Sequence, residues 1–115
     1  MSDTRTPAAD LRAAAQLLLD MADAADEDIT TNPYWRSELE PREHWFANGI
    51  DNACGGPAGW LASMFNPATA RALAATFRAW TRMGELDPDL LNRVGGAETV
   101  DVARQLLATA KEFAR

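Results

Sequence analysis

Apolar residues recur every three or four positions near the start of the chain, which predicts an amphipathic helix. Thr6 and Pro7 predict where it begins, because a threonine hydroxyl caps free backbone amides and proline is tolerated in the first turn. Five carboxylates lie between Asp20 and Asp28, where the negative end of the helix dipole disfavours them. We therefore expect the helix to fray near Ala25. Its expected buried stripe is Leu11, Ala14, Ala15, Leu18, Ala22 and Ala25.

The following segment, ITTNPYWRSELE, has neither a helical nor an alternating period. Asn32-Pro33 is a turn signal within it. A short helix is predicted from Pro41 to Asn48, with Gly49 as its stop and Trp45, Phe46 and Ile50 facing inward. A β-hairpin from Tyr34 to Phe46 is the alternative. We expect an irregular segment around residues 29–56.

Proline and glycine divide the second half into further helices. The spacing predicts a two-turn helix from Pro57 to Phe65 and a longer one from Pro67 to Met83, with Gly84 ending it. Asp87-Pro88 predicts a short helix that ends at Gly95-Gly96. The last helix is expected from about Glu98. The expected buried positions are Ala70, Leu73, Phe77 and Trp80 in the long helix, and Ala103, Leu106, Leu107, Ala110 and Phe113 in the last.

Composition supports helices throughout. Alanine supplies 23 of the 115 residues, whereas valine and isoleucine together supply five. Alanine favours helices and β-branched residues favour strands. The sequence therefore predicts an all-α fold, a small orthogonal bundle of about four helices plus one or two short ones. We expect residues 1–115 to form a single helical domain, with residues 1–6 disordered.

Charge and cysteine content limit the partners and the compartment. The net charge is −6, with −7 in residues 1–58 and +1 in residues 59–115. Such an acidic chain is expected to be repelled by nucleic acid and by anionic membrane surfaces. The uncharged stretch from Asn52 to Ala70 contains too many Gly, Pro and Asn residues for a membrane helix. One cysteine excludes an intrachain disulfide, and the start shows no secretory signal, so the cytoplasm is the expected compartment.

The sequence DNACGGPAGW raises the question of a phosphate-binding loop. Such loops use consecutive backbone amides at a helix start, usually with a lysine and a preceding strand. Gly55, Gly56 and Gly59 fit neither of the glycine spacings typical of such loops, GxGxxG and GxxxxGK. In addition, Pro57 removes one amide and no lysine follows. The simpler interpretation is a structural turn in which Gly55-Gly56 permits positive φ and Gly59 allows close approach of a neighbour. Its residues are Asn52, Gly55, Gly56, Pro57 and Gly59.

Cys54 is predicted just before a helix N-terminus, a position that lowers the pKa of a thiol, and His44 is the single histidine. No third catalytic member or oxyanion motif accompanies them, so we predict no enzyme activity, no metal and no cofactor. A small-ligand binder or thiol enzyme that uses the turn from Cys54 to Gly59 is kept as an alternative.

The strongest candidates for a binding surface are tryptophans and the acidic end of the first helix. Tryptophan is frequent at protein interfaces, although it also fills small cores. The carboxylates are either a solvated end or a docking surface for a basic partner. An acidic inhibitor that imitates nucleic acid is a further alternative. The candidate interface residues are Trp35, Trp45, Trp60, Asp20, Asp23, Asp26 and Glu27.

The segments DLRAAAQLLLDMADAA, NPYW, GWLASMFNPATARALAATFRAW and VDVARQLLATA cover most of the chain. Together they resemble small uncharacterised proteins of actinobacterial phages and prophages. The resemblance implies an accessory phage gene and no known activity. The resulting hypothesis is a non-enzymatic accessory protein in the cytoplasm of a bacterial host. It would bind a host or phage protein of unknown identity, with a homodimer as a further possibility.

Overall fold

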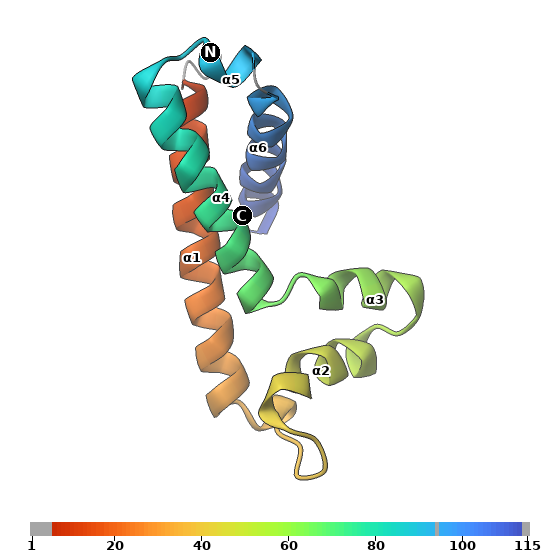
Figure 1. Cartoon of the computed structure of the whole chain (residues 1–115). Helices are drawn as coiled ribbons and strands as arrows, with labels where there is room; N and C mark the ends of the chain where they lie inside the picture. Colours follow the sequence, from red (N-terminus) through yellow and green to blue (C-terminus); the bar gives the residue numbers. More distant parts are fainter. Residues whose placement is uncertain (1–5, 94, 114–115) are drawn as a thin grey trace. The chain divides into compact units, whose positions relative to one another are not determined.

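The computed structural model describes residues 6–93 and 95–113, and within these ranges it contains helices and no strand (Figure 1). The all-α prediction is confirmed, and the hairpin alternative is wrong. Residues 1–5, for which disorder is predicted, lie outside the described ranges. The elements are α1 (Pro7–Thr31), η1 (Pro33–Trp35), η2 (Arg42–His44), α2 (Trp45–Ala53), α3 (Gly56–Met64), α4 (Pro67–Leu86), α5 (Leu90–Arg93) and α6 (Gly96–Phe113).

Contacts divide the chain into two compact units. We call the first the terminal unit, formed by Met1–Leu19 and Ala72–Arg115, and the second the central unit, formed by Asp20–Arg71. Helices α1 and α4 each contribute residues to both units, whereas α2 and α3 belong to the central unit alone. Each unit is described separately below.

Helix α1 is longer than predicted. It begins as expected, since the backbone amide of Ala9 donates to the Thr6 hydroxyl (3.1 Å), but it continues past Ala25 to Thr31. Two features of the central unit account for the extra turns. Ile29 is fully buried, which extends the apolar stripe. Arginines distant in sequence bind the carboxylates, and this offsets the unfavourable dipole interaction, which is worth under about 1 kcal/mol for an exposed group.

Helix α2 begins and ends later than the predicted helix from Pro41 to Asn48, and it passes through Gly49 instead of stopping there. Gly49 is buried, and a Cβ atom at this position would overlap the Trp35 ring. The Tyr34 hydroxyl donates to the Gly49 carbonyl (2.6 Å), and Trp35 stacks on Phe46 with ring centroids 5.7 Å apart. The glycine therefore serves a packing contact within the helix. The part of residues 29–56 outside helices is correspondingly short.

Helix α4 begins at Pro67 as predicted, with the Asn66 side chain accepting from the amide of Thr69 (2.9 Å). Its predicted end is wrong, because it continues through Gly84 to Leu86. A Cβ atom on Gly84 would lie 2.8 Å from the Leu91 Cδ1 atom, so this glycine also serves packing. The buried stripe agrees with the prediction at Ala70 and Phe77. Leu73 and Trp80 are only half-buried, and the next residues, Ala74 and Thr81, are buried in their place, together with Gly84.

The terminal unit holds most of the apolar core. Ion pairs connect its helices: Arg104 of α6 to Asp10 of α1 (2.6 Å), and Arg12 of α1 to Glu85 of α4. Helix α6 begins two residues before the predicted Glu98. Phe113, predicted to be buried, is 84% exposed. The buried apolar residues of this unit are Leu11, Ala14, Ala15, Leu18, Ala74, Phe77, Leu91, Val100 and Ala103.

Two substitutions of the same kind test this assignment of the core. Phe77 is fully buried, so Phe77→Ala is expected to lower the free energy of unfolding by about 3–5 kcal/mol through lost burial and a residual cavity. Phe113→Ala removes an exposed ring and is expected to change it by no more than about 0.5 kcal/mol. Urea denaturation followed by circular dichroism measures both values. Equal losses for the two variants would contradict the assignment.

Candidate functional site

The glycine turn positions α3. Gly55 is the extended N-cap (φ −75°, ψ −178°), Gly56 follows with φ +76°, and Pro57 lies in the first turn. The positive φ at Gly56 is readily available to glycine but strained for other residues. In the central unit the turn brings α3 back over α2 (Figure 1). Gly59 contacts the carbonyl oxygen of Cys54 so closely that a Cβ atom there would overlap it.

The side of α3 that packs is formed by small and polar side chains. Gly59 is its one buried residue, and Ser63 of α3 and the following Asn66 are half-buried. The large apolar side chains point elsewhere. Trp60, Leu61 and Met64 are 63%, 71% and 67% exposed, and Phe65, the C-cap residue, is 42% exposed. We call the surface of Trp60, Leu61, Met64 and Phe65 the α3 face.

The α3 face has the spacing of a buried helix face. Starting from Pro57, its members fall at i+3, i+4, i+7 and i+8, the positions that normally face a core. From the exposed fractions, these four side chains present about 500 Å² of surface, given that large aromatic side chains bury about 150–250 Å² each. Exposed apolar patches of about 300–600 Å² are often functional. The α3 face is therefore a candidate binding surface.

Other exposed apolar residues do not form a comparable group. The described part of the chain has ten exposed large hydrophobic residues, and four of them are the α3 face. The other six are distributed over the helices and the segment before α2: Met21, Tyr34, Leu39, Leu86, Val102 and Phe113. Single exposed apolar residues are common on protein surfaces, so these six need no functional explanation.

The candidate tryptophans Trp35 and Trp45 make internal contacts of the central unit. The Trp35 indole donates to the Asp28 carboxylate (2.7 Å), and the ring packs edge-on against Tyr34. The Trp45 indole donates to the Glu40 carbonyl (3.0 Å), and the Arg42 guanidinium lies 5.6 Å from its ring centroid. Both rings are half-buried. Among the three candidate tryptophans, Trp60 presents the largest fraction of its surface to solvent.

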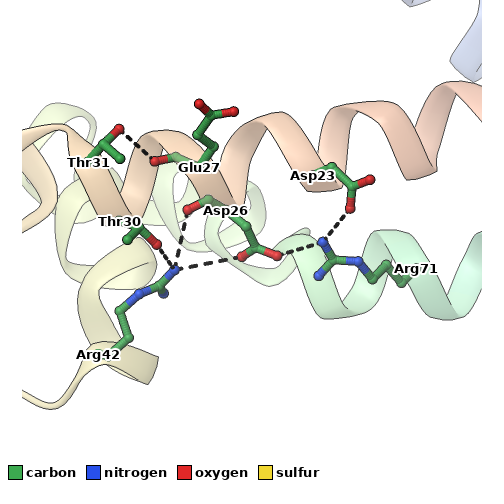
Figure 2. A network of polar contacts seen from close by, with 7 residues as sticks. All are labelled: Asp23, Asp26, Glu27, Thr30, Thr31, Arg42 and Arg71. Atoms are coloured by element: carbon green, nitrogen blue, oxygen red, sulfur yellow. Dashed lines mark hydrogen bonds and ion pairs between the residues drawn. The ribbon is translucent and has the colours of Figure 1, made fainter.

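The acidic end of α1 forms an ion-pair network (Figure 2). The Arg71 guanidinium binds the carboxylates of Asp23 (2.8 Å) and Asp26 (2.6 Å). The Arg42 guanidinium lies 3.8 Å from the Asp26 carboxylate and donates to the Thr30 hydroxyl (3.0 Å). Asp26 thus lies between two arginines from different elements.

Glu27 takes part in this network through its backbone carbonyl, which accepts a hydrogen bond from the Thr31 hydroxyl (2.8 Å). Figure 2 shows the Glu27 side chain pointing away from both arginines, and Asp20 is exposed. The hydrogen bonds that Arg71 donates to the Asp23 carboxylate, and then to that of Asp26, raise the pKa of Arg71 above its ordinary value. When folding raises the pKa of a cationic group, the group stabilises the folded state at pH values below that pKa, and this stabilisation is lost only above it. Because the ordinary value is already far above neutral, Arg71 contributes no pH dependence near neutral pH.

Cys54 and His44 are not brought together by any described hydrogen bond. Cys54 is a free, exposed cysteine, and His44 Nδ1 lies 3.2 Å from a Glu40 carboxylate oxygen. Among the residues that the structure describes, no group of three or more His, Cys, Asp or Glu residues is placed to hold a metal ion. The absence of catalysis nevertheless stays a prediction.

The comparisons with known proteins add no relationship: no protein-family model, curated protein or solved structure matches the chain. Over residues 6–93 and 95–113, no helix is both long and apolar enough to cross a bilayer.

Of the α3 face, only Trp60 was predicted from the sequence as a binding residue. The pairing of Arg42 and Arg71 with the carboxylates of α1 was not predicted. One signal was available for the α3 face. Trp60, Leu61 and Met64 lie in a helix that contains no charged residue. Such a helix has no polar side to turn toward solvent, so some of its apolar side chains are expected to be exposed. For the arginines no local signal exists, because their partners are separated from them by many residues.

The contact at Gly59 yields a prediction. Gly59→Ala is expected to lower the free energy of unfolding by about 1–3 kcal/mol, because the new Cβ atom overlaps the Cys54 carbonyl, a backbone group that cannot rotate away. The better helix propensity of alanine, worth up to about 1 kcal/mol, offsets part of this loss. Gly55→Ala is the matched control, since its Cβ atom would meet atoms no closer than 3.6 Å. If Gly55→Ala lowered the free energy of unfolding as much as Gly59→Ala, the close contact at Gly59 would not explain the effect.

The ion-pair network yields another prediction, which compares substitutions at two adjacent carboxylates, Asp26 and Glu27. Asp26→Asn removes the carboxylate between two arginines and is expected to lower the melting temperature slightly, by about 2–5 °C at low salt. The difference should shrink as salt screens the charges. Glu27→Gln removes the adjacent carboxylate, whose side chain points away, and should leave the melting temperature unchanged. Thermal denaturation at two salt concentrations tests both expectations, and a salt-independent loss at Asp26 would oppose this explanation.

Proposed function

We propose that the protein is a non-enzymatic accessory protein of phage or prophage type, which acts in the bacterial cytoplasm by binding another protein through the α3 face. The observation that carries the proposal is the exposure of Trp60, Leu61 and Met64 on α3 and of Phe65 at its C-cap. Tryptophan and large apolar residues supply much of the binding energy at protein interfaces, and Trp60 is the natural anchor here.

The geometry of α3 supports a binding role for its exposed side. The helix packs within the central unit through Gly59, so its large side chains are not needed to hold it in place. The close contact with the Cys54 carbonyl restricts how the helix can turn about its own axis. The α3 face is thus displayed in a defined orientation, which reduces the entropy lost when a partner binds.

The two alternative functions have less support. An acidic mimic of nucleic acid requires free carboxylates, and Asp23 and Asp26 at the acidic end of α1 are bound by Arg71. A thiol enzyme requires a base beside Cys54, and the hydrogen-bonding partner of His44 is Glu40. Neither arrangement supports the alternative as directly as the α3 face supports protein binding.

A pair of charge-adding variants tests the proposal. Leu61→Glu places a carboxylate in the α3 face, and Leu39→Glu adds the same charge at a residue that is 95% exposed outside it. Affinity capture and quantitative mass spectrometry should recover a partner with wild-type protein and with Leu39→Glu. Recovery with Leu61→Glu should fall by about tenfold or more, as expected for a hot-spot position.

Circular dichroism must first show that both variants retain the wild-type helix content. Capture of the same proteins at equal levels by all three baits would rule out the α3 face as the binding surface. Failure of wild-type protein to capture any partner, together with a monomeric mass, would oppose protein binding altogether.

A further inference from the structure

The central unit contains an open cavity of about 410 Å³, lined by η1, the segment after it and α2. This volume lies within the range of about 300–1,000 Å³ that is typical of small-ligand sites. Six of the nine described residues that line the cavity are Arg, Ser, Glu, Asp or Asn, so it suits a ligand rich in hydrogen-bonding groups. Of the described residues, those of the α3 face do not line it, and a ligand in this cavity is therefore independent of the proposed function.

One wall of the cavity is a side of α2. Asn48, Asp51 and Asn52 line it, and their positions i, i+3 and i+4 are neighbours on a helix surface. All three side chains are exposed, and none of them has a hydrogen-bonding or ion-pair partner among the residues that the structure describes. Two carboxamides and one carboxylate thus offer both donors and acceptors to a ligand.

Another wall is aromatic, and internal contacts hold it in place. The Tyr34 hydroxyl donates to the Gly49 carbonyl of α2 (2.6 Å). Trp35 packs edge-on against Tyr34 with ring centroids 5.0 Å apart, and its indole donates to the Asp28 carboxylate (2.7 Å). Tyr34 is nevertheless 53% exposed. The cavity therefore has an accessible aromatic surface whose position is set before a ligand binds, which reduces the entropy lost on binding.

The charges around the cavity nearly cancel. Arg36 supplies one positive charge, whereas Glu40 and Asp51 supply two negative charges. The Glu40 carboxylate is already engaged, since one of its oxygens lies 3.2 Å from His44 Nδ1. An anionic ligand would meet two carboxylates, and a cationic ligand would meet the Arg36 guanidinium. The arrangement therefore favours a neutral ligand.

We propose that this cavity binds a neutral sugar in its pyranose form. Sugar hydroxyls both donate and accept hydrogen bonds, which matches the carboxamides, carboxylate and guanidinium of the cavity. The C–H groups on one face of a pyranose ring form an apolar surface, which would pack against Tyr34. The hydroxyls at the ring edge would then reach Asn48, Asp51 and Asn52. A nucleoside has a larger flat apolar surface and fewer hydroxyls, and it fits this mostly polar lining less well.

Nuclear magnetic resonance on the full chain, labelled with ¹⁵N, tests the inference. The probes are glucose, galactose, mannose and N-acetylglucosamine, each titrated into the millimolar range, because a small polar ligand in an open cavity is expected to bind weakly. At least one sugar should shift the side-chain amide signals of Asn48 and Asn52 until they saturate. Sorbitol has similar hydroxyls but no ring face, so as the control it should leave these signals unchanged.

Two asparagine substitutions locate the binding. Asn48→Ala removes a carboxamide from the cavity and should weaken sugar binding by about three- to tenfold, the loss expected for one hydrogen bond. Asn92→Ala removes an exposed asparagine of α5, in the terminal unit, and should leave the affinity unchanged. Alanine favours helices, so both variants are expected to fold, and circular dichroism checks that they do. The Asn52 side-chain amide reports binding in both variants.

The outcomes decide the inference as follows. Saturable shifts that Asn48→Ala weakens and Asn92→Ala does not would support it. No shift of the Asn48 and Asn52 amides with any of the sugars would overturn it, as would equal weakening by the two variants. Equal shifts with sorbitol would show that the ring face is not recognised, and tighter binding of adenosine would identify a nucleoside site, so either result also overturns it. Since the α3 face takes no part, the capture experiment tests the proposed function separately.

Discussion

The close contact between Gly59 and the Cys54 carbonyl sets how α3 begins against the residue that caps α2. A helix that meets its neighbour through a glycine approaches closely but buries almost no apolar surface. Helix α3 does this, and its large side chains consequently lie on the other sides. Gly49 plays a related part in α2, where the missing side chain leaves room for the Trp35 ring. The aromatic contacts of Trp35 with Tyr34 and Phe46 follow from that space.

Two glycines inside helices, Gly49 and Gly84, show what could be predicted from the sequence and what could not. Proline and capping residues correctly located the starts of α1 and α4, since these signals act within one turn. Gly49 and Gly84 were expected to end helices, and both lie inside them. A glycine that ends a helix and one that admits a neighbour look identical in sequence. The neighbours that distinguish them, Trp35 and Leu91, are brought there by the tertiary fold.

The end of α1 and the α3 face were missed for different physical reasons. The helix dipole predicts that α1 frays among its carboxylates. However, Arg71, which is distant in sequence, binds two of these carboxylates. For α3, proline located the helix and Trp60 was a candidate interface residue, but the sequence provided no expectation for Leu61, Met64 and Phe65. Periodicity shows that one side of a helix favours an apolar environment, but not whether the same chain supplies it. The helix class, by contrast, followed from alanine content and needed no tertiary information.

The two units differ in how much apolar core supports them, and this bears on the role of the α3 face. The described buried apolar residues of the central unit are Ala22, Ile29 and Ala70, of which Ile29 alone is large. The terminal unit buries Phe77 and Leu11 completely, with seven further apolar residues around them. The central unit therefore depends more on hydrogen bonds, ring contacts and ion pairs, which each contribute about 0.5–1.5 kcal/mol at most when partly exposed. Covering the α3 face would add apolar burial to the unit that has least of it. Binding and stabilisation of the central unit are thus expected to be linked, because a ligand that binds the folded form alone stabilises that form.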